Sequence, residues 1–313
     1  MLSSGTDQKH LLDLGKRDLP MRVYDKYQNT TAVLEHCFSS AFENPVLTVK
    51  GCLTEKEKSA FNTLYTGLPS ILLESIAELD SLLELRNQMD AAFPHVSEPS
   101  APPPRRSKKP NLKGKRFTER SEQLLNKIEE PISMALWDQL LSLDGSFMND
   151  EQLRSEFFVC VMRQIWSSPS KQRVLDDLLA RFRIDRSDAV SVDRMFPYFA
   201  YHQIAIHSIV LSSNLQYHLS FLRIPRGARY KFIVTDNPAI DLCEGHMPLW
   251  TEDTNRFLWV IAPTAAVIIT GKTAGKTRFV TEREVAMYNT LLFKKANRYI
   301  LLDPDDDILS GCC

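Results

Sequence analysis

The chain has 313 residues, 43% of them hydrophobic, which is enough to bury a substantial core in one large domain or two ordinary ones. Its 38 basic and 39 acidic residues nearly cancel, so overall charge does not recruit nucleic acid or an anionic membrane. The chain does not open with a basic segment followed by an apolar one, and its six cysteines have no framework spacing. We therefore expect a soluble, cytoplasmic protein with reduced cysteines and no membrane partner.

The sequence of residues 1–95 predicts a short strand followed by helices. Thr54 precedes Glu57 by three residues, which is the signature of a capping box, and apolar residues at helical spacing follow. A second segment starts at Pro69 and carries leucines and isoleucines near one face. This pattern predicts a long amphipathic helix.

Residues 96–117 differ sharply in composition, because a proline run is combined with basic residues that cannot build a core. We expect a mobile, extended insertion here. It is either an arm that binds nucleic acid or another phosphate-bearing partner, or a solvated linker. The candidate nucleic-acid-binding residues are Arg105, Arg106, Lys108, Lys109, Lys113, Lys115 and Arg116.

Helical periodicity returns over residues 118–215 and predicts a helical bundle. From about residue 216 the period changes to short β-branched and aromatic runs, interrupted by a helix with a second capping box at Thr281 and Glu284. The expected fold class is α+β, a predominantly helical bundle followed by a small, mostly antiparallel sheet with a C-terminal helix. We expect the segments 1–95, 96–117, 118–215 and 216–313 to form one compact unit.

Three polar residues, Thr235, Asp236 and Asn237, end the apolar run that begins at Tyr230, and Pro238 follows them. Pro238 disfavours helical backbone angles at Asn237, so it ends the strand and suits a cap. Asp236 is not explained by a cap alone. The turn is either a structural Asx turn or a site built at a strand end, where sites of sheet proteins often lie.

The sequence FIVTDNPAI resembles the phrase F-I-T-S-D-N-P-V of a mainly bacterial family, domain of unknown function forty-two thirty-eight. The strand YHLSFLRIP before it, the strand APTAAVIIT after it and a late helix with Asn289 also resemble that family. The resemblance covers nearly the whole chain, although only the T-D-N-P core is specific. It implies no established reaction, but it favours Thr235, Asp236 and Asn237 as residues that line a site.

The chain departs from the family pattern at two places. The family usually has a histidine-proline motif near its N-terminus, where this chain offers only His10 without the proline at that spacing. The serine between Thr235 and Asp236 is also missing.

Histidines provide the remaining candidate chemistry. His218 lies in a strand that we expect to pair with residues 231–234, and His202 and His207 lie on a helix expected nearby. A histidine and an aspartate in one cleft could act as a base and its orienting partner, or hold a divalent metal. Each histidine could equally be a hydrogen-bonded structural residue.

Other motifs are weaker. The segment GKTAGKT has three residues between Gly271 and Gly275 where a phosphate-binding loop needs four, so we expect a tight β-hairpin instead. Cys243 and His246 supply only half of a zinc spacing. We expect the terminal cysteine pair to be exposed thiols. No G-x-S-x-G or H-E-x-x-H motif occurs.

The first functional hypothesis is a bacterial effector of stress or phage defence that hydrolyses a phosphate-containing substrate, such as nucleic acid or a nucleotide. Asp236 would be a metal ligand or base, Asn237 and Thr235 polar contacts, and His218 an assisting group, with a divalent metal of unknown identity as the candidate cofactor. A second hypothesis is a non-catalytic protein-interaction module in which T-D-N-P is a structural turn. A third is a nucleic-acid binder that uses residues 103–116.

Overall fold

The structure, a computed structural model, describes residues 21–26, 28–34, 48–49, 51–92, 119–129, 132–166, 168, 171–184, 190–213, 217–242, 257–270, 277–296 and 299–301. The chain divides into two compact units. Unit 1 comprises Met1–Pro45, Pro131–Lys171 and His207–Cys313, and unit 2 comprises Val46–Glu130 and Gln172–Ile206. Unit 1 is not continuous in sequence, because strands from both ends of the chain pair with each other. The expected segment boundaries stay a prediction.

Unit 2 is helical in its described part. It contains α3 (Glu55–Leu64), α4 (Ser70–Ala92), α5 (Glu119–Glu129), α8 (Gln172–Arg181) and the first part of α9 (Val192–Ser213). The predicted capping box at the start of α3 is confirmed. The N–H of Glu57 donates to Thr54 Oγ1 at 3.2 Å, and the N–H of Thr54 donates to Glu57 Oε2 at 2.8 Å.

Glu57 also joins α3 to the start of α9. Its side chain is fully buried, and Arg194 donates to it through Nε at 2.9 Å and through Nη2 at 2.8 Å. The N–H of Ser191 adds a third donor at 3.0 Å. Burial raises the pKa of Glu57, but the bonds from Arg194, Thr54 and Ser191 outweigh it and hold the pKa below 4.5. The carboxylate is therefore ionised and fully used by the fold at neutral pH.

Unit 1 contains two sheets. The first has the order β2 (Thr30–Leu34), β1 (Met21–Asp25), β9 (Tyr299–Leu301) and β4 (Val234–Thr235). The second has the order β5 (Ala239–Asp241), β6 (Phe257–Ala262), β7 (Ala265–Thr270), β3 (His218–Arg223) and β8 (Arg278–Phe279). Neighbouring strands are antiparallel except β3 and β8, which are parallel. The second capping box is confirmed at the start of α10 (Glu282–Lys295).

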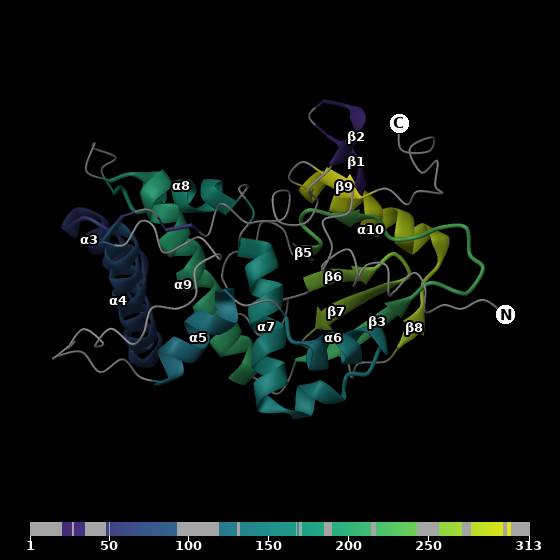
Figure 1. The fold of residues 1–313 in the computed structure, drawn as a ribbon, viewed down its shortest axis with the longest axis horizontal. Helices are drawn as coiled ribbons and strands as arrows, with labels where there is room; N and C mark the ends of the chain where they lie inside the picture. Colours follow the sequence, from purple (N-terminus) through teal and green to yellow (C-terminus); the bar gives the residue numbers. More distant parts are fainter. Residues whose placement is uncertain are drawn as a thin grey trace, which may run out of the picture. The chain divides into compact units, whose positions relative to one another are not determined.

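Helices cover both faces of the five-stranded sheet within unit 1 (Figure 1). On one face, Leu222 and Leu258 pack in a core cluster with Leu292 of α10. On the other face lie α6 (Met134–Leu141), the 3-10 helix η2 (Ser146–Asn149) and α7 (Glu151–Trp166), where the Phe157 and Trp259 rings are 5.8 Å apart. The α+β class, with helix in the majority, is confirmed by this arrangement.

Two expectations about strand pairing are wrong. Strand β3, which carries His218, pairs with β7 and β8 and not with residues 231–234. The reason lies in Asn289, whose side chain accepts from the N–H of Ile233 at 3.0 Å and donates to the carbonyl oxygen of Lys231 at 2.8 Å. The expected hairpin at GKTAGKT is also wrong, because β3 lies between β7 and β8.

Among the described helices, none is both long enough and apolar enough to cross a membrane.

The Glu57 network predicts a pH-dependent stability of unit 2. We expect Glu57→Gln to lower its free energy of unfolding by about 2–4 kcal/mol at neutral pH, since a buried charge network loses its carboxylate. Because the folded-state pKa of Glu57 is lowered, this contribution is present above pH 4.5 and is lost as the pH falls through the folded-state value. Urea unfolding at neutral and acidic pH measures both effects.

The matched control is Glu55→Gln, since the Glu55 side chain is 92% exposed on the same helix. Equal losses of stability for the two variants at neutral pH would contradict the role of Glu57.

Candidate functional site

The T-D-N-P turn connects β4 to β5 in unit 1. Thr235 is fully buried, Asn237 is 6% exposed and Asp236 is partly buried. The predicted polar strand end is therefore present, but two of its three polar side chains lie inside the fold. Their bonding partners decide between the structural and the functional interpretation.

Asn237 helps to cap the C-terminal end of α10. The last carbonyl groups of a helix have no partner within it, so they need donors from elsewhere. Lys26 and Asn237 supply them from two distant parts of the sequence. The Lys26 Nζ donates to the carbonyl oxygens of Phe293, Lys294 and Ala296 at 2.9, 3.2 and 3.1 Å, and the Asn237 Nδ2 donates to that of Lys295 at 3.2 Å.

The turn also bonds to itself. The backbone N–H of Asn237 donates to Thr235 Oγ1 at 3.2 Å, as in the structural interpretation of the motif. The Asn237 Oδ1 is a buried acceptor that has no hydrogen-bond partner in the described part of the chain. The hydroxyl of Thr235 and the amide nitrogen of Asn237 thus serve the fold.

The predicted pairing of Asp236 with His218 is not assembled by the strand order. Asp236 follows β4 of the four-stranded sheet, whereas His218 begins β3 of the five-stranded sheet. Among the residues that the structure describes, no three His, Cys, Asp or Glu side chains form a group that could hold a metal ion. A divalent metal at Asp236 stays a prediction.

The other two candidate histidines have structural partners. In unit 2, His202 is fully buried; its Nε2 lies 2.5 Å from Asp80 Oδ1, and its Nδ1 lies 3.0 Å from the Tyr65 hydroxyl. Burial raises the pKa of Tyr65 well above its usual value, so this hydroxyl stays protonated beside Nδ1. In unit 1, His207 stacks on Trp166 at 5.3 Å between ring centroids.

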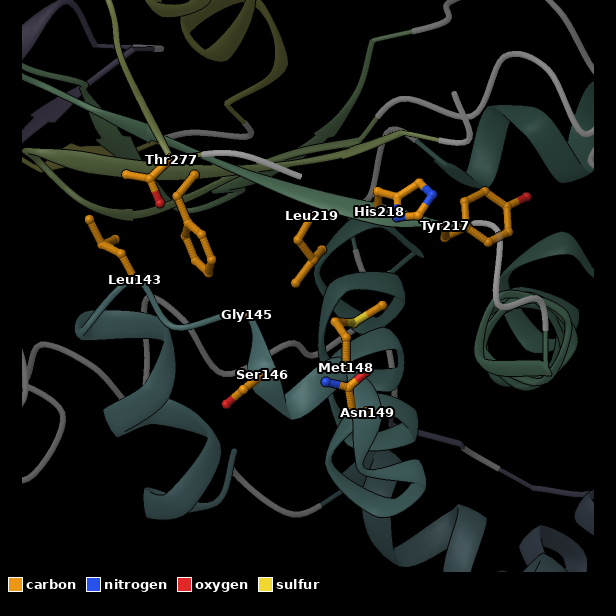
Figure 2. Close-up of a pocket in the computed structure, with 10 residues that line it drawn as sticks. Leu143, Gly145, Ser146, Met148, Asn149, Tyr217, His218, Leu219 and Thr277 are labelled. Carbon is orange, nitrogen blue, oxygen red and sulfur yellow. The ribbon is translucent and has the colours of Figure 1, made fainter. Parts of the chain in front are cut away.

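His218 lines a cavity of about 370 Å³ in unit 1, between η2 and β3 (Figure 2). Four apolar side chains and five polar or amphipathic ones surround it. The apolar residues are Leu143, Met148, Leu219 and Phe221. The others are Ser146, Asn149, Tyr217, His218 and Thr277, while Gly145 contributes backbone.

The cavity has a buried base and a polar rim. Phe221 and Tyr217 are 4% and 7% exposed, and the Tyr217 ring packs edge-on against Phe158 at 6.3 Å. Ser146 and Asn149 are exposed at the η2 side, and Figure 2 shows Thr277 at the opposite end from His218. Within the described residues, the side chains of Asn149, His218 and Thr277 have no hydrogen-bond partner, so they are free to bond a ligand.

The segment that carries η2 is held in place by hydrogen bonds. Arg154 donates to the carbonyl oxygen of Met148 at 2.7 Å and to that of Ser212 at 3.0 Å. The Ser146 hydroxyl donates to Asp144 Oδ2 at 3.0 Å, and its N–H donates to Asp144 Oδ1 at 2.9 Å. The Ser146 hydroxyl is thereby used by the turn that begins at Asp144.

Sequence reasoning found His218 but missed the rest of the cavity, including Ser146, Asn149, Phe221 and Thr277. One signal was present in the alternation of Tyr217, Leu219 and Phe221, which places three side chains on the same face of a strand. Nothing local in the sequence connects that face with residues 143–149.

Several candidate residues lie outside the described residues. These are His10, Cys243, His246, the terminal cysteine pair and the basic residues Arg105, Arg106, Lys108, Lys109, Lys113, Lys115 and Arg116. Their proposed roles stay predictions.

No family model, no curated protein and no solved structure matches this chain. The resemblance to the domain of unknown function forty-two thirty-eight family stays a prediction.

The capping role of Asn237 can be tested through stability. We expect Asn237→Ala to lower the free energy of unfolding of unit 1 by about 1–2 kcal/mol, because the Lys295 carbonyl loses its donor at a largely buried site. Thr290→Ala is the control, since that exposed hydroxyl bonds only within α10. Chemical unfolding of both variants measures the difference, and an unchanged stability of Asn237→Ala would refute the capping role.

Proposed function

We propose that the chain is a non-catalytic binding protein whose unit 1 takes a small ligand into the cavity beside His218. The observation that carries this proposal is the combination of an aromatic base with two polar side chains, Asn149 and Thr277, that have no partner among the described residues. Sites for small molecules commonly combine an apolar lining with a few convergent polar groups.

The T-D-N-P turn supports this proposal over the hydrolase hypothesis. The Asn237 side chain caps α10, and the Thr235 hydroxyl accepts a hydrogen bond from within the turn. Both polar groups therefore have structural roles that require no substrate. Asp236 lies in the turn before β5, whereas His218 begins β3, and β6 and β7 lie between those two strands. Burial also raises the pKa of Cys160 to about 12, so its thiol is not a nucleophile at neutral pH.

A thermal-shift screen of the purified full chain tests the binding proposal. We expect a ligand from a panel of nucleosides, nucleotides, sugars and amino acids to raise the unfolding temperature, since a ligand at a hundredfold excess over its Kd stabilises by about 2.7 kcal/mol. Asn149→Ala should abolish or strongly reduce the shift. Ser220→Ala is the control, because Ser220 lies on β3 and does not line the cavity.

Two outcomes would contradict the proposal. One is the absence of a stabilising ligand in the whole panel, and the other is an equal response of wild type and Asn149→Ala.

The competing hydrolase hypothesis has its own test in Asp236→Asn. This change keeps the shape of the side chain and removes its charge, so a metal ligand or base loses its function while a structural turn largely tolerates it. We expect wild type and variant to fold alike and to show equal background hydrolysis of nucleic acid and of phosphodiester model substrates with added divalent metal ions. Turnover by wild type that the variant loses would establish the hydrolase instead.

A further inference from the structure

We propose that unit 1 carries a second binding surface, apart from the cavity, that takes single-stranded nucleic acid. We call it the β8 surface, and it consists of Arg223, Arg226, Arg229, Arg278, Phe279 and Arg283, all of which are exposed. The Phe279 ring provides a platform for a base, and the arginines provide positive charge for the phosphates. The inference is independent of the ligand that the cavity takes.

Backbone and side-chain hydrogen bonds bring the segments of the β8 surface together. Strands β3 and β8 are neighbours in the sheet, and their register places Arg223 beside Phe279 (Figure 1). The N–H of Val280 donates to the carbonyl oxygen of Arg223 at 3.0 Å. The Tyr230 hydroxyl donates to the carbonyl oxygen of Val280 at 3.0 Å, so the loop after β3 is held against the end of β8.

A tight turn presents two of the arginines. The N–H of Ala228 donates to the carbonyl oxygen of Pro225 at 3.1 Å, and Gly227 has φ +84°, a backbone conformation that favours glycine. Arg226 lies within this turn and Arg229 directly follows it. The exposure of both side chains is therefore fixed by the turn.

Phe279 is the aromatic part of the β8 surface. At 62% it has the largest exposed fraction of the exposed large hydrophobic side chains in the described part of the chain. The Arg223 guanidinium carbon lies 5.9 Å from the centroid of its ring, within the range of a cation–π interaction. A ring that is positioned by a cation and largely open to water suits a nucleobase, because stacking on aromatic side chains does not require a particular base.

The charge around Phe279 is positive. Three arginines have no ion-pair partner among the residues that the structure describes, namely Arg226, Arg229 and Arg283. Arg278 is paired with Glu284 at 2.7 Å. Glu282 and Glu284 are the only acidic residues in 223–231 and 277–284. Since guanidinium groups bind phosphate oxygens through two parallel N–H bonds, the unpaired arginines complement a phosphate backbone.

The same residues favour a single strand over a duplex or a protein partner. Base faces in a duplex are covered by neighbouring base pairs, so they do not stack on a side chain at the surface. A protein interface has an apolar core of several side chains. Phe279 is the one exposed large hydrophobic side chain in residues 223–231 and 277–284.

Fluorescence anisotropy of the full chain with a labelled oligothymidylate of about 12 nucleotides tests the proposal. We expect wild type to bind the single strand at least about fivefold more tightly than a duplex of the same length. Phe279→Leu should weaken the single strand at least about fivefold, because it keeps an apolar side chain but removes the ring. Phe279→Tyr should retain wild-type affinity.

The arginines are tested through the salt dependence of the same binding. A single strand contributes a slope of about −0.7 in log affinity against log salt for each phosphate contact. Arg226→Gln, Arg229→Gln and Arg283→Gln together should therefore reduce the magnitude of the slope by about 2.

Unit 2 provides a matched control with the same kinds of residues. Arg173, Arg181 and Arg183 are exposed, and Phe182 is 45% exposed. Phe182→Leu, and the three arginines changed together to Gln, should alter neither the affinity nor the slope. Unfolding curves of all variants confirm that each one is folded.

Four outcomes would overturn the proposal. The first is that the oligonucleotide does not bind. The second is equal binding by wild type, Phe279→Leu and the triple arginine variant, which would place the contact elsewhere in the chain. The third is an equal loss in the unit 2 controls, which would show an unspecific attraction by positive charge. The fourth is displacement of the oligonucleotide by polyglutamate as effectively as by unlabelled oligothymidylate, which would identify an acidic protein as the partner.

Discussion

The C-terminal end of α10 is the point on which the architecture of unit 1 depends. A helix that ends inside a fold leaves carbonyl groups that water does not reach, and each of them needs a donor. Here one ammonium group, from Lys26, serves three carbonyls, and one amide, from Asn237, serves the fourth. The positive charge of Lys26 also complements the negative end of the helix dipole.

This cap joins segments that are far apart in the sequence. Lys26 follows β1, Asn237 lies in the turn between β4 and β5, and β9 follows α10 and pairs with both β1 and β4. The polar character of the T-D-N-P turn thus has a structural cause. In the sequence, these residues resemble a functional site because an amide that caps a helix and an amide that contacts a substrate act through the same hydrogen-bonding groups.

The candidate binding cavity lies on the other face of the five-stranded sheet from α10. Strand β3 divides the two roles by its alternation, since Leu222 packs toward α10 while Leu219 and Phe221 face the cavity. The α10 side is filled by a core of large apolar residues. The η2 side keeps a cavity whose base is formed by buried aromatic side chains and whose rim carries polar side chains.

Sequence reasoning predicts local structure well and long-range pairing poorly. Both capping boxes, at Thr54 with Glu57 and at Thr281 with Glu284, begin helices as predicted, because all their atoms lie within one turn. The strand of His218 was paired wrongly because the register of a short strand is set by residues elsewhere, in this case by Asn289, which occupies the backbone of residues 231–233. The cavity could not be predicted either, since residues 143–149 and β3 meet only in the folded chain.

The most direct test of this account is an amide correlation spectrum of the full chain, recorded by nuclear magnetic resonance with and without a saturating amount of a ligand that the thermal-shift screen identifies. The account predicts shifts of the Asn149 side-chain amide and of backbone amides around Ser146, His218 and Phe221, with the Asn237 side-chain amide unchanged. Shifts concentrated at Asp236 and Asn237, with the cavity signals unmoved, would contradict it and return the site to the T-D-N-P turn.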